Sequence, residues 1–488
     1  MVKSILHFKE FGTKKLEKVI EKFMKEPTDI ASFVHGVHDE MLTLGLDIIK
    51  ESLEECNQMI REDWKRKEKW SIVRTDHKNL ITSMGAVTFE KTLFKNKETG
   101  EECYLLDSIL GLEKHARITE DAEAKLLEEA VQTSYRRGGE ATGPTDTVSK
   151  QTVKNKIHRL EFPTPPIPAK KKVVDYLYID ADEDHVKLQF QEQKGDLKKD
   201  ENNRKNNGIL AKLVYVYEGI EPEAPKSKRH KLINPYYFSG VYEGDENTAL
   251  WNEVYQYLDS HYDLKQVKKI YLGGDGAAWI KFGLKQIAGI TYVLDEFHMS
   301  KYLNQMTTHM PLSASDAKAE LRKAIKNGTK AEFASIVERI DSYAETPAQH
   351  KRVSDGANYI QSNWTSAKIR LSERSSICGC SAEGHVSHVL ASRMSSRPMG
   401  WSRLGCDKMS HLRAYYYNGG DMLELVRFQE KELLKAAGAE DVILSCSEVL
   451  LSEKNKNGEV GKYLDAITHS LSLNTKKRAG FRSHIHGL

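Results

Sequence analysis

Four carboxylates stand in sequence contexts that favour ligand chemistry. Asp182 lies in YIDADEDHV after an apolar run typical of a strand, and Asp180, two residues earlier, shares its pleat face. Asp275 lies between glycines in YLGGDGAAW, and Glu383 lies in CGCSAEGHV at the expected start of a helix. Ligands bind at strand ends in α/β sheets, and glycine lets a backbone or substrate approach closely. Each acid alone has a simpler explanation as a helix cap or turn residue.

Taken together, the acids favour metal-dependent catalysis. Carboxylates that cluster repel one another unless a cation or a proton lies between them. Hard oxygen ligands select Mg²⁺ or Mn²⁺, and two such ions can hold the attacking and leaving oxygens of an in-line phosphoryl transfer. A Glu among small residues, with Arg393 and Arg397 nearby, strengthens this interpretation because arginine suits phosphate. Solvated surface arginines remain the alternative for each one.

A further acid and histidine follow the next strand-like segment. Asp295 and His298 lie one helical turn apart in VLDEFHMSKYL, so both could face one site. His298 could orient a phosphate or water, or carry a proton. The simpler interpretation is a histidine whose hydrogen bonds are satisfied near the core.

A basic helical segment precedes the acids. RRGGEATGPTDTVSKQTVKNKIHRL combines a Gly-rich break with a short helix that we expect to open near Ser149. This is the sequence shape of a helix-turn-helix, and an ordinary surface hairpin of helices is the alternative. The candidate DNA contacts on the helix are Lys150, Lys154, Lys156 and Arg159.

The elements that must position these residues change along the chain. Residues 14–70 have helical periodicity, and residues 71–112 predict two strands around the turn NKETGE. Four prolines between positions 163 and 168 predict a linker. VVDYLYIDAD and HVKLQF then predict two strands separated by a short acidic turn, and ILAKLVYVYEGI and HKLINPYYFSGVYEG predict two more. Strand–helix alternation follows, so we expect a mixed α/β sheet.

The charge of the chain is unevenly distributed. The 488 residues carry 73 Lys and Arg against 70 Asp and Glu, for a net charge of +3, which taken alone disfavours a nucleic-acid partner. However, residues 136–172 carry +6, and residues 384–413 and 466–488 carry +4 each. The sequence contains no run of about 18 apolar residues, so it predicts no membrane span. Six scattered cysteines and a start without a secretory pattern predict a cytoplasmic protein.

Several long strings resemble one known family. YIDADEDHVKLQ, YLGGDGAAWIK, YVLDEFHMSKYL and CGCSAEGHVSHVLASRMSSRPMGWSRLGCDKM, together with SKQTVKNKIH, resemble bacterial insertion-sequence DDE transposases of the ISLre family, relatives of the Mutator-like group. The resemblance runs from about residue 120 to residue 413 and is most specific around Asp275 and Glu383.

The resemblance implies an RNase H-like mixed-sheet core in an α/β protein. By motif, Asp182, Asp275 and Glu383 would be the catalytic, metal-binding acids, with Asp180 as the alternative to Asp182. The cofactor would be two Mg²⁺ ions, for which Mn²⁺ can substitute. Asp295 and His298 match an accessory D-x-x-H element. The 108 positions from Asp275 to Glu383 fit a helical insertion.

The implied activity is DNA transposition. Such an enzyme binds the terminal inverted repeats of its element, cleaves DNA and joins the end to target DNA by direct phosphoryl transfer, as a homodimer or higher homo-oligomer on the bacterial nucleoid. The main alternatives are an RNase H-like nuclease or resolvase without strand transfer, and a catalytically inactive DNA-binding protein. A glycosidase with paired carboxylates would explain none of the basic segments.

The resulting domain prediction has six parts. In chain order they are a helical region (1–70), a β-hairpin with a helix-turn-helix-like DNA-binding region (71–162), a Pro/Lys linker (163–172), the catalytic core (173–306 and 376–413), the helical insertion (307–375) and a C-terminal helical region with a basic tail (414–488).

Overall fold

The computed structural model describes most of the chain. The described residues are 3–113, 115–144, 146–189, 198–199, 205–378, 382–397 and 399–437. The helix expected beyond residue 437 and the basic tail therefore lie outside the described residues. The chain forms two compact units, which we treat separately: unit 1 is Met1–Ala130, Ser134–Val153 and Met422–Leu488, and unit 2 is Val131–Thr133 and Lys154–Asp421.

Unit 1 begins with helices, as the periodicity predicts. They are α1 (Lys3–His7), the π-helix η1 (Phe8–Gly12), α2 (Thr13–Lys25), α3 (Ile30–Glu62) and α4 (Trp64–Lys69). Aspartates set two of the starts: the Asp29 side chain accepts a hydrogen bond from the Ser32 amide at 3.1 Å, and that of Asp63 accepts one from the Arg66 amide at 2.7 Å. The end of α3 packs through Ile60 against Phe89 and Phe94 of the following hairpin.

The hairpin differs from the predicted one. Its strands are β1 (Trp70–Thr82) and β2 (Gly85–Asn96), and β3 (Glu102–Cys103) adds only two residues. The tight turn lies at Ser83 and Met84, next to Gly85 with φ of 136°. The prediction of a strand over ECYLLDSILGL is wrong, because Leu105 and Leu106 bury their side chains on the short helix α5 (Leu105–Ile109).

The segment expected to form a helix-turn-helix contains three helices: α6 (Glu120–Gln132), α7 (Tyr135–Glu140) and α8 (Lys150–Arg159). The last opens directly after Ser149, whose Oγ accepts the Thr152 amide at 3.1 Å. Glycine allows close packing, since a Cβ on Gly138 would lie 2.9 Å from the Leu126 carbonyl oxygen. The helix α19 (Met422–Ala437) is tied to α6 by Arg427 and Glu120 at 2.9 Å.

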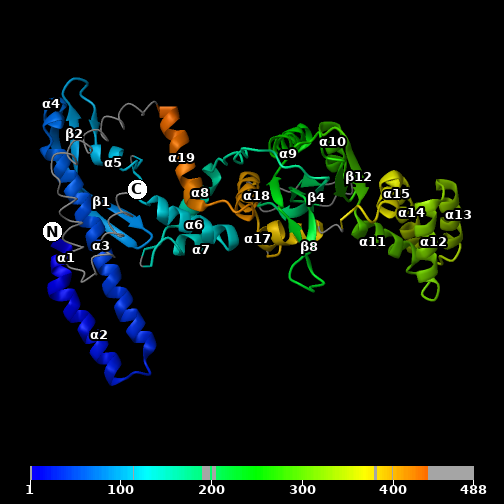
Figure 1. The fold of residues 1–488 in the computed structure, drawn as a ribbon, viewed down its shortest axis with the longest axis horizontal. Coiled ribbons are helices and arrows are strands. Elements are labelled where there is room, and N and C mark those ends of the chain that lie inside the picture. The colour runs from blue at the N-terminus through cyan, green and yellow to red at the C-terminus, as the bar shows by residue number, and fades with distance from the viewer. Residues whose placement is uncertain are drawn as a thin grey trace. The chain divides into compact units, whose positions relative to one another are not determined.

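Unit 2 contains a five-stranded sheet of order β10-β7-β4-β11-β12, and Figure 1 labels two of its strands, β4 and β12. The strands are β4 (Tyr176–Lys187), β7 (Gly208–Tyr217), β10 (Tyr236–Gly240), β11 (Lys269–Gly274) and β12 (Ile290–Leu294). The first three pair antiparallel, whereas β11 runs parallel to both β4 and β12. The prediction of a mixed α/β fold with a mixed sheet is therefore confirmed. Two small ribbons, β5 (Lys198–Lys199) with β6 (Lys205–Asn206) and β8 (Gly219–Pro222) with β9 (His230–Ile233), lie outside it.

Two predicted strand boundaries in this unit are wrong. No turn separates YIDAD from HVKLQ, because β4 pairs with β7 without interruption from Tyr178 to Lys187. Asp182 thus lies within a strand rather than at a turn. Conversely, HKLINPYYF forms two strands, β9 and β10, which Asn234 separates with φ of 49°.

The two faces of the sheet have different coverings. One face packs Leu177, Ile179 and Ala181 against the helices α9 (Asn247–His261) and α10 (Ala278–Gln286) in an apolar core. The other face carries tyrosines that stack across strands, such as Tyr178 and Tyr271 with centroids 5.7 Å apart. Unit 2 also contains short helices, namely η2 (Gly244–Glu246) before α9, and α16 (Ala382–Val386), η3 (Ser387–Ala391) and α17 (Ser392–Met394) after the helical segment.

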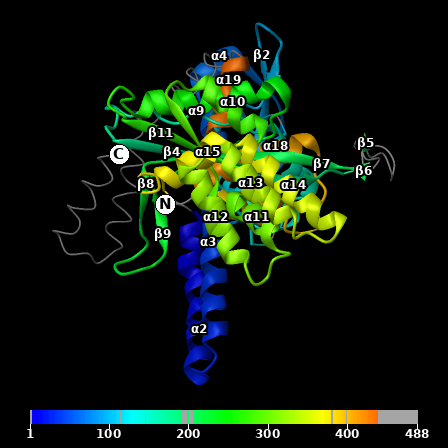
Figure 2. The same ribbon diagram turned by 90° about the vertical axis from the view of Figure 1, so that its right-hand side faces the viewer.

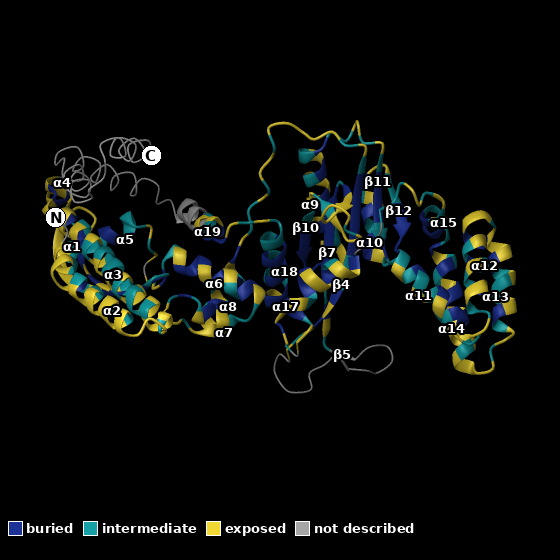
Figure 3. Cartoon of the chain, turned by 60° about the horizontal axis from the view of Figure 1, so that its bottom comes forward, coloured by how far each residue is buried: buried dark blue, intermediate teal, exposed yellow. Residues whose placement is uncertain are grey.

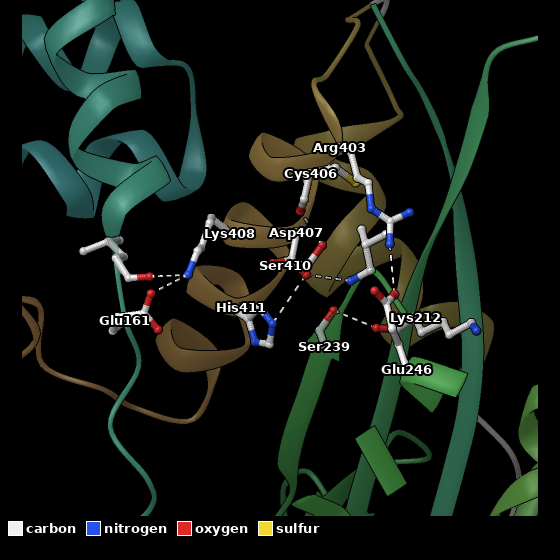
Figure 4. Close-up of polar contacts among 12 residues, drawn as sticks. Glu161, Lys212, Ser239, Glu246, Arg403, Cys406, Asp407, Lys408, Ser410 and His411 are labelled. Atoms are coloured by element: carbon white, nitrogen blue, oxygen red, sulfur yellow. Dashed lines mark hydrogen bonds and ion pairs between the residues drawn. The ribbon is translucent and has the colours of Figure 1, made fainter. Parts of the chain in front are cut away.

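Helix α18 (Arg403–Tyr417) contacts both the residues just before the proline segment and the end of the edge strand β10 (Figure 4). Lys408 donates to the Leu160 carbonyl at 2.6 Å and contacts Glu161 at 3.1 Å. On the same helix, Asp407 accepts the amide of Val241, just beyond β10, at 2.9 Å.

The segment between β12 and α16 is helical, with α11 (Glu296–Thr307), α12 (Ala314–Asn327), α13 (Lys330–Asp341), α14 (Pro347–Ser362) and α15 (Trp364–Ser372). These helices pack side by side, toward the viewer in Figure 2. They share a core of their own that includes Leu303, Leu321 and Phe333, and this core also takes in Leu294, the last residue of β12. Figure 3 shows the exposed outer sides of α12 to α14. Within the described ranges, no helix is long and apolar enough to cross a membrane.

Candidate functional site

Three aspartates come to one level of three neighbouring parallel strands: Asp182 within β4, Asp275 directly after β11 and Asp295 directly after β12. Asp180 of β4 pairs with Gly273 of β11, so the next residues on that face, Asp182 and Asp275, lie side by side. Gly274 pairs with Leu294 of β12, so Asp275 and Asp295 directly follow these two paired strand ends. The parallel register thus brings Asp182 close to Asp275, which follows it by 93 positions in the chain.

The Asp182 carboxyl group is held in an unfavourable environment for its charge. Burial, followed by repulsion from Asp275 and Glu183, raises its pKa to about 7. The Asp182 side chain is only half-buried, so it remains accessible. A divalent cation between Asp182 and Asp275 would remove this penalty.

Asp295 and His298 form a second polar pair next to these carboxylates. Asp295 is buried, and its oxygens accept the amides of Phe297 at 3.2 Å and His298 at 3.1 Å at the start of α11. The same carboxylate holds His298 Nδ1 at 2.8 Å. This hydrogen bond, opposed by burial and assisted by the charges of Asp275 and Asp182, raises the pKa of His298. Asp295 thus caps α11 and also holds the ring of His298.

Asp180 has a different environment from Asp182. It is 5% exposed and accepts hydrogen bonds from the hydroxyls of Tyr215 at 3.0 Å and Tyr217 at 3.1 Å. Burial raises its pKa to about 6, against the opposing effect of these bonds. A Cβ on Gly273 would lie 2.2 Å from Asp180 Oδ1, which accounts for one glycine of the GGDG string. This geometry favours Asp182 over Asp180 as the acid that meets a ligand.

The loop that carries Asp275 is held by the helices of the following segment. The Tyr359 hydroxyl on α14 donates to the Asp275 carbonyl oxygen, and its ring stacks on Tyr302 of α11 at 3.8 Å. Gly276 has φ of 102°, and a Cβ there would lie 2.8 Å from Oδ1 of the buried Asn363.

Sequence reasoning missed these supporting residues. Alternation in LVYVYEG could have identified Tyr215 and Tyr217, because both lie on the pleat face of β7 that faces Asp180. No local signal identifies Tyr359 or Asn363.

Glu383 is not assembled with the aspartates. It lies exposed in the first turn of α16, and residues 379–381 before it are outside the described residues. The helix does pack against β4, and His385 lies with its ring centroid 4.6 Å from that of Tyr215. Helix α16 therefore covers the sheet face that carries Asp180, through His385. Among the described residues, no three His, Cys, Asp or Glu side chains are grouped closely enough to hold a metal ion.

The predicted DNA-contacting residues of α8 differ in exposure. Lys150 and Arg159 are exposed and Lys154 and Lys156 are half-buried, whereas Val153 and Ile157 are fully buried. The helix therefore packs through the face that carries Val153 and Ile157, and the four basic side chains flank that face.

The two arginines after Glu383 differ. Arg397 is exposed, as a phosphate contact requires. Arg393 is only 3% exposed, and its guanidinium lies 4.9 Å from the ring centroid of Trp401. The structure corrects its assignment: Arg393 is buried against an aromatic ring and is not presented to DNA.

Curated relatives match over most of the chain. A UPF0236 protein of Caldanaerobacter subterraneus subsp. tengcongensis is 34% identical over 422 residues, which cover 86% of this chain and 85% of the relative, and its name combines eleven gene loci. Another from the same organism is 36% identical over 421 residues, covering 86% of both chains. A relative from Streptococcus gallolyticus, named as a UPF0236 protein in the vanSb 3′ region, is 23% identical over 403 residues, covering 78% of this chain and 83% of the relative.

Among solved structures, the Drosophila P element transposase strand transfer complex matches with a TM-score of 0.28 and 10% identity, over 64% of this chain and 94% of that one. This similarity is too low to carry an argument about the fold. The family model described as "Uncharacterised protein family (UPF0236)" matches residues 23–432. On that match, and on relatives at 34–36% identity over most of its length, the chain belongs to the UPF0236 family.

Proposed function

We propose that this protein is a DNA transposase that cleaves and joins DNA by metal-dependent phosphoryl transfer. The observation that carries the proposal is the register that brings Asp182 of β4 beside Asp275 after β11. Acids on neighbouring strands of a mixed sheet are what the resemblance to ISLre-family transposases, with their RNase H-like core, leads us to expect. The parallel pairing of β4 with β11 supports the proposal, because it brings the two acids to one level of the sheet.

Carboxylate oxygens are the ligands that magnesium prefers. Asp182 and Asp275 would supply two carboxylates, and Glu383 on α16 the third. Burial and the neighbouring charge of Asp275 raise the pKa of Asp182 despite the hydrogen bond from the Glu183 amide, and a bound cation would favour its charged form. When bound, two Mg²⁺ ions (or Mn²⁺) would activate the attacking oxygen and stabilise the leaving oxygen.

His298 would act beside the acids on the DNA itself. Because Asp295 engages Nδ1, the imidazole is oriented with Nε2 directed to other partners. Among the described residues, no hydrogen bond engages Nε2. A raised pKa favours the protonated ring, which would donate a hydrogen bond to a phosphate oxygen.

The family relatives support transposition over simple nuclease activity. One relative's name combines eleven loci of a single genome, and a second combines four. Several loci that share one protein name are what a DNA segment that inserts copies of itself leaves behind. A resolvase or housekeeping nuclease does not require such multiplication.

The partners in this proposal are the terminal inverted repeats of an element and its target DNA. The basic residues of α8, Lys150, Lys154, Lys156 and Arg159, would contact DNA near those ends. Because two ends must be paired before joining, we propose a homodimer or larger assembly on nucleoid DNA in the bacterial cytoplasm.

The test is cleavage and joining of DNA that carries the sequence flanking the gene. With Mg²⁺, wild-type protein should nick the element end and transfer the 3′-hydroxyl to a target plasmid. Asp275→Asn should lose both steps and keep DNA binding. Asp355→Asn changes an exposed carboxylate on α14 and should behave as wild type.

The products separate the alternatives. Hydrolysis without joined product would favour the nuclease or resolvase. Binding without any cleavage by the wild type would favour an inactive DNA-binding protein and overturn the proposal.

A further inference from the structure

A cationic groove lies on the helical segment between β12 and α16. Its volume is about 490 Å³, and its lining comes from two helices that are far apart in the sequence. The charged and hydroxyl side chains that line it are Arg322, Lys323 and Lys326 of α12, and Ser372, Arg374 and Ser375 at and after the end of α15. No carboxylate is among the described residues of the lining.

The charges in this groove are mostly uncompensated. Arg322 is half-buried and held by Glu296 at 2.5 Å and Ser300 at 2.6 Å, both on α11. Lys323, Lys326 and Arg374 are exposed, and no ion pair joins them to any other described residue. Like charges at this spacing repel one another, so an anion in the groove would relieve an existing cost.

A structural role in helix stability explains only some of the basic residues that line the groove. A lysine in the last turn of a helix, such as Lys326 in α12, stabilises the helix dipole. Lys323 lies a turn earlier, and Arg374 follows a different helix. The convergence of these charges on one groove therefore needs another explanation.

The groove is connected to the elements that carry the acids. Arg322 contacts α11, which begins directly after Asp295. Glu373, next to Arg374, contacts Lys269 at 2.6 Å and the hydroxyl of Tyr271 at 2.8 Å, both on β11. That strand ends directly before Asp275. Arg374 therefore lies toward the start of β11, at Lys269, and DNA that passes the acids would have to extend along this strand to reach the groove.

We propose that this groove binds backbone phosphates of the DNA that flanks the cleaved bond. Lysine and arginine would supply charge, and the serine hydroxyls would donate hydrogen bonds, without contact to base edges. Binding at this groove is thus independent of DNA sequence. The proposal rests on the proposed function for DNA as the substrate.

The experiment measures affinity for an element-end duplex across a range of salt concentrations, using the full chain. Lys323→Ala with Lys326→Ala removes two phosphate contacts and should flatten the slope of log K against log[salt] by about 2. Arg374→Ala should flatten it by about 1, and its position outside α12 guards against a local loss of that helix. The matched control, Lys351→Ala with Arg352→Ala, removes two exposed charges from α14 and should leave the slope unchanged.

A smaller salt dependence of DNA binding in the groove variants, with no change in the control, supports phosphate binding in the groove. Unchanged slopes in variants with wild-type circular dichroism overturn it, as does an equal fall in the control. The proposed function stands in those cases if the wild type still cleaves and joins DNA, and both proposals fail if the wild type binds no DNA.

Discussion

The two places that carry the proposed catalytic acids are built differently. Asp182 lies on β4, and Asp275 directly follows β11, so the pairing of these two parallel strands limits how far apart the two acids can be. Glu383 lies exposed on α16, a helix of five residues. A sheet can bring two acids together in the absence of ligand, at the cost of their mutual repulsion. An acid on a short helix avoids that cost and has to be brought in by the ligand.

The largest expected effect is on metal-dependent cleavage, and metal binding then distinguishes Asp275 from Glu383. Asp275→Asn and Glu383→Gln should each reduce Mg²⁺-dependent cleavage by a factor of about 10³ or more, since each removes a ligand. In the DNA-free protein, titration calorimetry with Mn²⁺ should detect weakened binding only for Asp275→Asn. Equal weakening in both variants would show that Glu383 is already part of the site and would remove the distinction.

The pH dependence of stability tests the cost of the paired strands. The folded pKa of Asp182, about 7, lies above its ordinary value, so the folded state retains a proton that the unfolded chain releases near pH 4. Without metal, stability should therefore fall as pH rises from about 4 to about 7 and stay low above that.

Asp182→Asn removes this loss. At pH 8 and without metal, the variant should be more stable by on the order of 2 kcal/mol, after allowance for solvent screening of a partly exposed group. Chemical unfolding at pH 5 and pH 8 measures the difference, with Asp355→Asn as the control. A variant with the same pH dependence as wild type would contradict a strained acid pair.

Tyr359→Phe tests whether the helical segment positions Asp275. The change removes the hydroxyl that bonds the Asp275 carbonyl and keeps the ring on Tyr302. We expect a cleavage rate about tenfold lower, a higher Mg²⁺ concentration for half-maximal rate and unchanged DNA affinity, because a small misplacement of a catalytic group is costly. Tyr343→Phe, at a side chain that is 59% exposed, is the matched control. A lower rate with an unchanged Mg²⁺ requirement would assign Tyr359 to general packing.

The smallest expected effect concerns α8. Lys154→Ala with Lys156→Ala should weaken DNA binding several-fold and flatten its salt dependence by up to about 2 in slope. Lys18→Ala with Lys22→Ala makes an equal change of charge at exposed positions of α2. An unaltered salt slope in the α8 variant would return this helix to the interpretation as a surface hairpin.

The sequence predicted the acids of the sheet better than it predicted their local structure. Apolar runs that end in aspartate pointed to Asp275 and Asp295, because strand ends carry a local pattern. The same reasoning placed a turn at Asp182, since a cluster of acids between apolar runs has the composition of a loop. In the structure β4 continues through Asp182, because pairing with β7 satisfies the backbone hydrogen bonds on that side of the strand.

Burial and long-range contacts were beyond the reach of local pattern. Arg393 has the composition of a phosphate contact, and only the folded chain shows it against Trp401. Tyr359 and Asn363 lie more than eighty residues from the loop that they support. Their roles depend on how α14 and α15 pack, which periodicity alone does not specify.

The apolar core shared by α11 to α15 and Leu294 has a consequence for the modular history of such chains. Because this helical segment covers the last residue of β12, deleting the segment would leave an apolar strand end exposed to solvent. Its removal would expose Leu294 directly before Asp295 and its helix. A shortened descendant or a graft onto another scaffold would need a replacement apolar cover at that strand end. We therefore expect the helices and the strand end to have been inherited as one piece.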